Sequence, residues 1–160
     1  MKKTIAAQLA ASGWAFDVNT DGITHEESLA GPAGGNCLNW VAGHLVATYS
    51  KLLAGLGLEP VWTEERAEPY RRGAGELADP TLAVDFAEIR ADLATATQRT
   101  IETVMGLSDE DLAGPAPFSP RRDPDETVES LLGLIAFHQA YHTGQTGLLR
   151  RAAGKAGAIR

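Results

Sequence analysis

The stretch AFHQAYHTGQTGLLRR, residues 136–151, places two histidines, His138 and His142, inside an otherwise apolar helical pattern. The pattern predicts a helix that begins near Thr127 and ends near Gly154. Its inward residues are Val128, Leu131, Leu132, Ile135, His138, His142, Thr146 and Leu149. Because side chains four residues apart on a helix lie one above the other, about 6 Å apart, both imidazoles can face a single metal ion.

The spacing of these two histidines has two interpretations. Each imidazole can be neutral, half buried and hydrogen-bonded to a carbonyl or a hydroxyl group, or both can hold one ion. His44 favours the ion, because it borders the inward stripe of a second predicted helix and can meet the pair across the core. Three imidazoles would leave positions open for water or substrate on Zn²⁺, Ni²⁺ or Fe²⁺, which is a catalytic type of site.

Three further segments show helical spacing, and no segment shows the alternation that is typical of strands. The sequence therefore predicts an all-α protein, a four-helix bundle formed by a single domain that spans residues 1–160. In the first helical segment, residues 3–17, the candidate core residues are Ile5, Leu9 and Phe16. The second helix is expected to follow Asn36 as its N-cap and to stop at Gly55 or Gly57. Its inward residues are Leu38, Val41, Leu45, Thr48 and Leu52.

The third helix is expected to open with Asp79 as its N-cap and Pro80 at its first position. Its inward residues are Leu82, Phe86, Ile89, Leu93, Ala96, Thr100 and Val104. Residues 58–79, which precede it, contain prolines and glycines and predict an irregular surface excursion.

Charge and composition exclude several classes of partner. Lys and Arg total 14 against 21 Asp and Glu, a formal net charge of -7, so neither nucleic acid nor membrane is an expected partner. The N-terminal run MKKTIAAQLAASGWAF imitates a signal peptide only faintly, because Gln8, Ser12 and Asp17 interrupt its apolar part. Cys37 is the single cysteine and cannot form an internal disulfide, so we expect a cytoplasmic protein.

No fourth ligand emerges from the pattern. The acidic residues on the flank of the third helix, where solvent is the expected neighbour, are Asp85, Glu88 and Asp92. Cys37 precedes His44 by about 10 Å along the helix axis and is expected to be a small buried residue. His25 is expected to face solvent in the first loop.

The spacing also resembles the HExxH helix of zinc proteases, but this chain reads HQAYH. Gln139 stands where the glutamate would be and cannot take a proton from bound water at neutral pH. The protease mechanism is therefore disfavoured.

At these residues the chain resembles the DinB-like superfamily of four-helix-bundle metalloproteins. GGNCLNWVAGHL resembles the family's entry to helix two, and FHQAYHTGQTGLLRRAAGKAGAI resembles its last helix, including the HxGQ continuation. The resemblance implies that His44, His138 and His142 are the metal ligands. Many relatives carry Glu at the position of Gln139. This difference is expected to affect a contact behind the ligands or a contact at the protein surface, and to leave the ligands themselves unchanged. Gln145 matches the family's HxGQ position, where it orients a ligand or a bound water, or serves as a packing amide.

The resemblance also implies an activity, because characterised relatives include metal-dependent transferases and isomerases that use low-molecular-weight bacterial thiols. We therefore expect a divalent metal, such as Zn, Ni or Fe, to activate a thiol for attack on an electrophilic small molecule. The alternative is a non-catalytic bundle in which the metal has a structural or sensing role.

Three surface features complete the expectations. A second apolar flank of the last helix predicts a homodimer, and its residues are Leu134, Phe137, Tyr141 and Leu148. Trp40 is expected to lie in the core or at an interface, with the wall of a substrate pocket as the alternative. Three cations lie at or just beyond the end of the last helix, Arg150, Arg151 and Lys155. They can bind an anionic thiol, or they can stabilise the negative end of the helix dipole.

Overall fold

Four long helices form the body of the protein in a computed structural model that describes residues 1–32, 35–74, 77 and 80–159. The long helices are α1 (Lys2–Thr20), α3 (Leu38–Gly55), α5 (Phe86–Gly106) and α7 (Val128–Ala152). The short elements are α2 (His25–Leu29), α4 (Glu64–Ala67), α6 (Asp109–Ala113) and the 3₁₀ turns η1 (Glu68–Tyr70) and η2 (Pro80–Leu82). Within the described ranges no strand forms beyond one isolated bridge between Pro115 and Thr127. The predicted all-α class is confirmed.

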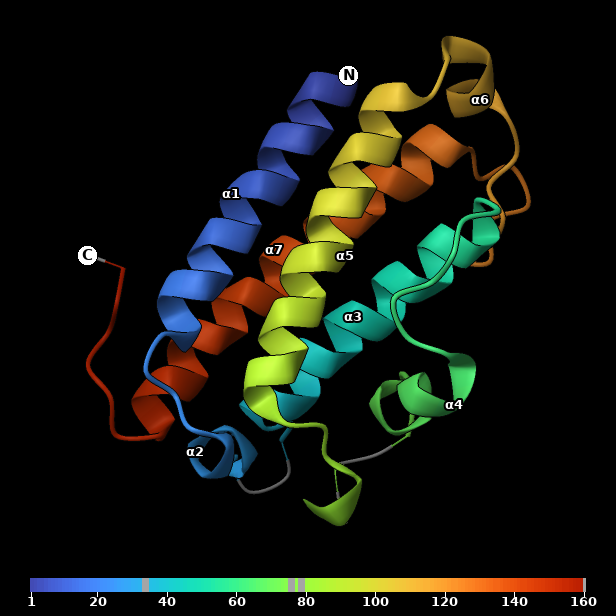
Figure 1. Ribbon diagram of the computed structural model, residues 1–160. Coiled ribbons are helices and arrows are strands. Elements are labelled where there is room, and N and C mark those ends of the chain that lie inside the picture. Colours follow the sequence, from blue (N-terminus) through green and yellow to red (C-terminus); the bar gives the residue numbers. More distant parts are fainter. Residues whose placement is uncertain (33–34, 75–76, 78–79, 160) are drawn as a thin grey trace.

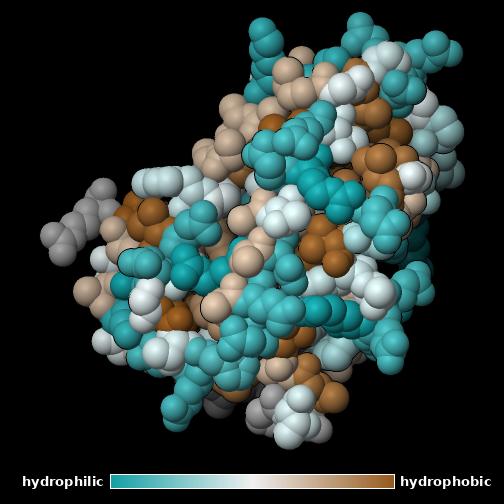
Figure 2. Space-filling view, viewed as in Figure 1, coloured by the Kyte–Doolittle hydropathy of each residue, from teal (hydrophilic) through white to brown (hydrophobic). Residues whose placement is uncertain are grey.

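The four long helices enclose one hydrophobic core (Figure 1). Helix α1 packs on α5 and α7, and α3 packs on the same two helices from the other side. The larger fully buried side chains include Phe16, Tyr49, Leu52, Ile89 and Leu131. On the face shown in Figure 2, hydrophilic side chains are interspersed with smaller groups of hydrophobic ones. No helix in the described part of the chain combines the length and the apolar composition needed to cross a bilayer.

The last helix agrees with its sequence prediction. Thr127 is the N-cap of α7, where it forms a capping box with Ser130, and the helix ends at Ala152. The N-cap of α3, by contrast, is Cys37 and not Asn36. The Cys37 sulfur accepts a hydrogen bond from the backbone N–H of Trp40 at 3.4 Å, which satisfies one of the free donors of the first turn.

The start of the third long helix was predicted wrongly. Helix α5 begins at Phe86, because the carboxylate of Asp85 accepts hydrogen bonds from the backbone N–H groups of Ala87 and Glu88. Asp79, the expected cap, lies outside the described residues. Leu82 belongs to η2 and is 58% exposed, so it is not a core residue.

Residues 58–74 are not the simple surface excursion that their prolines and glycines predict. Trp62 and Tyr70 are buried against α3 and α5. The Trp62 indole N–H donates to the carboxylate of Asp92 at 2.6 Å, which ties this segment to α5. The Tyr70 hydroxyl donates to Asn39 at 2.9 Å and accepts from the backbone N–H of Val84 at 2.8 Å. This segment therefore adds an inner wall to the bundle beside α3.

Candidate metal centre

Helices α3 and α7 bring three histidines together. His44 comes from α3, and His138 and His142 come from successive turns of α7. One ring nitrogen of each lies within 4.8 Å of the others. The Nε2 atoms of His44 and His138 are 3.2 Å apart. We call these residues the three-histidine cluster; it unites all three residues that the sequence singled out.

Hydrogen bonds on the outer side of two rings leave their inner nitrogens free to coordinate. His44 Nδ1 donates to the carbonyl oxygen of Tyr70 at 2.8 Å. His142 Nδ1 donates to the side-chain oxygen of Gln145 at 2.7 Å. Because both partners are acceptors, each Nδ1 carries the proton and each Nε2 keeps its lone pair. Such outer contacts are typical of metal-binding histidines.

The cluster fits a divalent ion. Metal to nitrogen bonds of about 2.0 to 2.1 Å hold neighbouring ligand nitrogens about 2.9 to 3.4 Å apart in tetrahedral or octahedral sites. The separation of 3.2 Å between His44 Nε2 and His138 Nε2 lies in that range. The donor set is also suitable, since three neutral imidazoles are ligands that Zn²⁺, Ni²⁺ and Fe²⁺ share.

Burial keeps the cluster unprotonated. His44 and His142 are each 9% exposed, and burial lowers the pKa of both rings below the usual value of 6.5. Burial, together with the neighbouring His142 and His44, lowers the pKa of His138 to about 3. The rings are therefore neutral at pH 7, which is the form that binds metal.

Acidification is expected to destabilise the metal-free protein. Because the three rings have lowered pKa values when folded, the unfolded chain binds more protons below an unperturbed pKa of about 6.5. The stabilisation is fully present above that pH and is lost as the pH falls toward the folded pKa values, about 3 for His138. Denaturant titrations between about pH 7 and about pH 5, where carboxylates stay ionised, measure this loss. His138→Gln should flatten the profile, and an equally steep profile in that variant would contradict the assignment.

Aromatic side chains border the cluster on two sides. The Trp40 ring stacks on the His44 ring, with centroids 4.7 Å apart and planes 8° apart. Trp40 is 6% exposed, so the expected core position is correct, and its indole N–H has no hydrogen-bond partner among the described residues. Tyr141 contacts the His142 ring edge-on at 5.2 Å and is itself 57% exposed.

The acidic side chains of α5, which the sequence did not predict as ligands, have other partners and do not belong to the cluster. Asp85 caps α5, Asp92 accepts from Trp62, and Glu88 pairs with Arg66 at 2.7 Å. Over the described residues, the group that can hold a metal contains histidines alone.

The expectation for His25 holds only in part, because its side chain is 38% exposed but does not lie in a loop. This residue begins α2 and is partly buried, and its Nδ1 accepts a hydrogen bond from the backbone N–H of Phe86 at 3.2 Å. His25 therefore links α2 to the start of α5 and does not face solvent freely.

Gln139 is a core residue and not a surface contact, which corrects one of the two expectations for it. Its side chain is fully buried and accepts a hydrogen bond from the Tyr49 hydroxyl at 2.7 Å. Its amide nitrogen donates to Thr97 at 3.4 Å. Gln139 thus joins α7 to α3 and α5 behind the ligands.

Replacing Gln139 with methionine is expected to destabilise the protein by about 2 kcal/mol, because the buried hydroxyls of Tyr49 and Thr97 lose a partner while the volume changes little. Denaturant unfolding measures the change. In the double variant Tyr49→Phe/Gln139→Met, part of the loss should be regained, because the unpaired phenol is removed as well. Strictly additive losses would contradict this network.

The basic residues near the C-terminus have structural partners. Arg150 donates to the carbonyl oxygens of Asn19 at 3.1 Å and Asp21 at 2.6 Å. Lys155 pairs with Glu27 at 3.0 Å. These contacts hold the chain at the end of α7 against the end of α1 and against α2, so these two cations are engaged away from the cluster.

Tyr70 is the residue at the centre that the sequence reasoning missed. It orients His44 through its backbone carbonyl, and its ring lies against Gly43. A Cβ atom at Gly43 would lie 2.2 Å from the Tyr70 ring. A glycine inside a helical pattern, directly before a candidate ligand, was the available signal for this close approach.

Together, the fold and the cluster define a helical-bundle protein with a three-histidine centre between two of its long helices. The sequence profile of the DinB superfamily matches residues 15–146, a range that contains the whole cluster. The chain therefore belongs to the DinB superfamily.

The comparison with solved structures supports the same fold. A conserved protein from Enterococcus faecalis, known from its crystal structure, is similar to this chain with a TM-score of 0.76 and 18% sequence identity. The similarity covers 97% of this chain and 98% of that protein, and at this identity it shows the fold alone. No match was found among curated proteins.

Proposed function

We propose that the protein binds one divalent transition metal ion, such as Zn²⁺, Ni²⁺ or Fe²⁺, through His44, His138 and His142. The observation that carries this proposal is the convergence of three neutral imidazoles within 4.8 Å, two of which are held with their Nδ1 protons pointing outward.

The proposed activity is that of a metal-dependent transferase acting on a low-molecular-weight thiol. A bound divalent ion supplies Lewis acidity, which lowers the pKa of a thiol so that its thiolate can attack an electrophile at neutral pH. The three histidines leave room for such a ligand, because they contribute three donor atoms. The described residues place no carboxylate in the cluster, so the thiol proton passes to solvent and not to an acidic side chain. A cytoplasmic location accords with this proposal, since low-molecular-weight thiols are kept reduced there.

Thiol binding can be tested on protein loaded with Co²⁺. A thiol that reaches the cluster should produce a sulfur-to-metal charge-transfer absorption, and His142→Ala should abolish it. If bacterial thiols leave the spectrum unchanged while removal of the metal markedly lowers the melting temperature, the thiol-transferase proposal fails. The structural role would then be the better account.

The protein is also proposed to form a homodimer through the outer face of α7. Phe137, Tyr141 and Leu148 are 65%, 57% and 67% exposed on this helix. A Cβ atom at Gly144, which lies between them, would meet nothing within 4 Å, so a second helix can approach closely there. Burying such a patch removes apolar surface from water.

We expect sedimentation to report a dimer for the wild type at tens of micromolar and a monomer for Leu148→Lys, because a buried unpaired ammonium opposes association. Trp14 on α1 is also 61% exposed, and Trp14→Lys serves as the matched control that should remain dimeric. A monomeric wild-type protein would rule out this interface.

A further inference from the structure

The indole N–H of Trp40 is a buried hydrogen-bond donor that has no acceptor in the described part of the chain. The side chain as a whole is 6% exposed. An unpaired buried donor is costly, and folded proteins leave few of them. The other buried tryptophan, Trp62, follows this rule, because its indole N–H donates to the carboxylate of Asp92 at 2.6 Å. The donor of Trp40 therefore requires an acceptor that the described residues do not supply.

Trp40 lies directly against one of the three histidines. Its ring stacks on the ring of His44, with centroids 4.7 Å apart and planes 8° apart. The two residues are one turn apart on α3, and the backbone N–H of Trp40 is held by the sulfur of Cys37 at 3.4 Å. His44 Nε2 in turn lies 3.2 Å from His138 Nε2. The unpaired donor thus belongs to a ring that covers one face of a proposed metal ligand.

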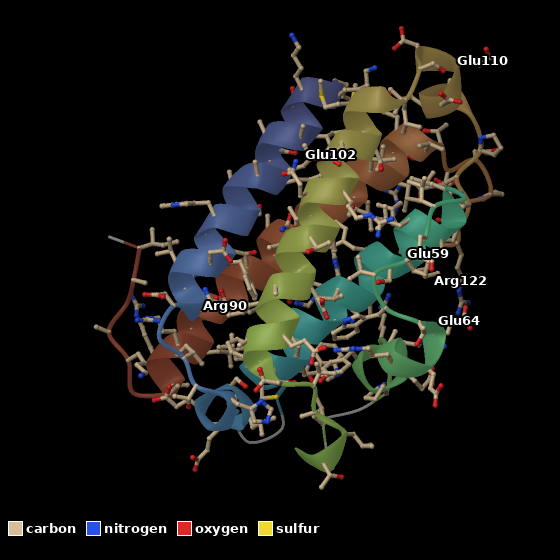
Figure 3. All side chains as sticks on the ribbon, in the orientation of Figure 1. Glu59, Glu64, Arg90, Glu102, Glu110 and Arg122 are labelled. Carbon is tan, nitrogen blue, oxygen red and sulfur yellow. The ribbon has the colours of Figure 1, made fainter. Side chains whose placement is uncertain are left out.

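No carboxylate of the described chain serves as the acceptor. Acidic side chains such as Glu64, Glu102 and Glu110 are exposed on the outside of the bundle (Figure 3), and the group that can hold a metal contains histidines alone among the described residues. His138 is only half-buried, so the cluster reaches the surface and is accessible to a small molecule. A ligand that enters there can bring the acceptor that Trp40 needs.

We propose that the indole N–H of Trp40 donates a hydrogen bond to the non-protein ligand that completes the metal centre, so that the site prefers small anions that keep a lone pair after binding. This inference rests on the proposed function, because the same three histidines hold the metal. A thiolate belongs to this class of ligand, since its sulfur retains lone pairs when it coordinates. A hydrogen bond to a charged acceptor is stronger than one to a neutral acceptor, so the donor favours the anion.

Two small nitrogen ligands separate this hydrogen bond from metal coordination. Protein loaded with Co²⁺ would be titrated with azide, which keeps lone pairs when bound, and with imidazole, whose second nitrogen carries a proton and accepts nothing. Trp40→Phe keeps an aromatic ring beside His44 but removes the N–H. It should weaken azide binding about tenfold and leave imidazole binding within about twofold, as the visible absorption of Co²⁺ reports.

Trp62→Phe is the matched control. It makes the same change at a buried tryptophan whose N–H already has Asp92 as its partner. The ratio of azide affinity to imidazole affinity should therefore stay as in the wild type.

A second measurement needs no change at Trp40. The chain has three tryptophans, so the NMR spectrum of ¹⁵N-labelled protein loaded with Zn²⁺ should contain three indole N–H signals. Trp14→Phe and Trp62→Phe identify the signals by subtraction. Azide should move the Trp40 signal downfield, as a newly formed hydrogen bond does, and should leave the Trp62 signal in place, because that N–H is already bonded.

The outcomes distinguish this inference from the proposed function. If Trp40→Phe changes the affinities for azide and imidazole by the same factor, or if azide leaves the Trp40 signal unmoved, the assignment of Trp40 is overturned while the metal centre stands. If thiols do not alter the Co²⁺ spectrum but Trp40→Phe loses the preference for azide, the donor role stands and the thiol activity falls. Protein that takes up neither Co²⁺ nor Zn²⁺ would overturn both.

Discussion

Replacing any one of His44, His138 and His142 with alanine is expected to lower the affinity for a divalent metal by about a hundredfold or more. Each ligand of a structural zinc site contributes a few kcal/mol to a total of about 10 to 16 kcal/mol, so the loss of one of three is severe. Elemental analysis after gel filtration, followed by competition with a coloured chelator, measures the loss. The wild type should retain close to one ion per chain.

His25 offers the matched control for these variants, because it is the remaining histidine of the four in the chain and lies outside the cluster. His25→Ala should keep its metal, although it loses the hydrogen bond from the backbone N–H of Phe86. Undiminished metal in any two of the three cluster variants would end the three-histidine proposal. A loss in His25→Ala equal to that in the cluster variants would show that the assay reports folding and not coordination.

Gly43→Ala is expected to destabilise the protein by about 3 kcal/mol or more, although it changes the sequence by one methyl group. The added Cβ would lie 2.2 Å from the ring of Tyr70, which is fully buried and cannot move aside without breaking its contacts to Asn39 and Val84. Overpacking a filled core typically costs about 1 to 3 kcal/mol, and this overlap is with a rigid ring. Denaturant unfolding of the metal-free protein measures the change.

The same substitution at Gly133 provides the control. Gly133 lies on the exposed side of α7, where a Cβ atom would meet nothing within 4 Å. Gly133→Ala should therefore stabilise the protein by up to about 1 kcal/mol, because alanine is the better helix former. If both variants change stability by the same amount, the close packing of Tyr70 on Gly43 is not a determinant of the fold.

The sequence predicted those elements whose signals are local. The apolar repeat of α7, with Thr127 as its cap, was sufficient to place that helix to within two residues at each end. The start of α5 was missed because Asp79 followed by Pro80 and Asp85 both offer a helix start, and the choice depends on contacts outside the segment. Val84 donates to the hydroxyl of Tyr70, and this contact holds the chain extended immediately before α5.

The residues of the site also differ in whether local sequence or only tertiary structure identifies them. The pair His138 and His142 follows from helical spacing alone, and His44 followed from its place beside an inward stripe and from the family resemblance. Gln145 was singled out with two possible roles, and the structure places its oxygen 2.7 Å from His142 Nδ1. Tyr70 carries no such pattern, because it lies in an irregular segment whose position cannot be read from periodicity.

The sequence by itself determined the helical class of this protein and the three histidines that lie on inward faces, because periodicity and side-chain chemistry are properties of each segment alone. Tertiary structure decided the rest. It placed the Tyr70 carbonyl against His44 and buried Gln139 between Tyr49 and Thr97. These contacts join residues far apart in the chain. They arise only when the long helices pack and the polar groups buried between them must find partners.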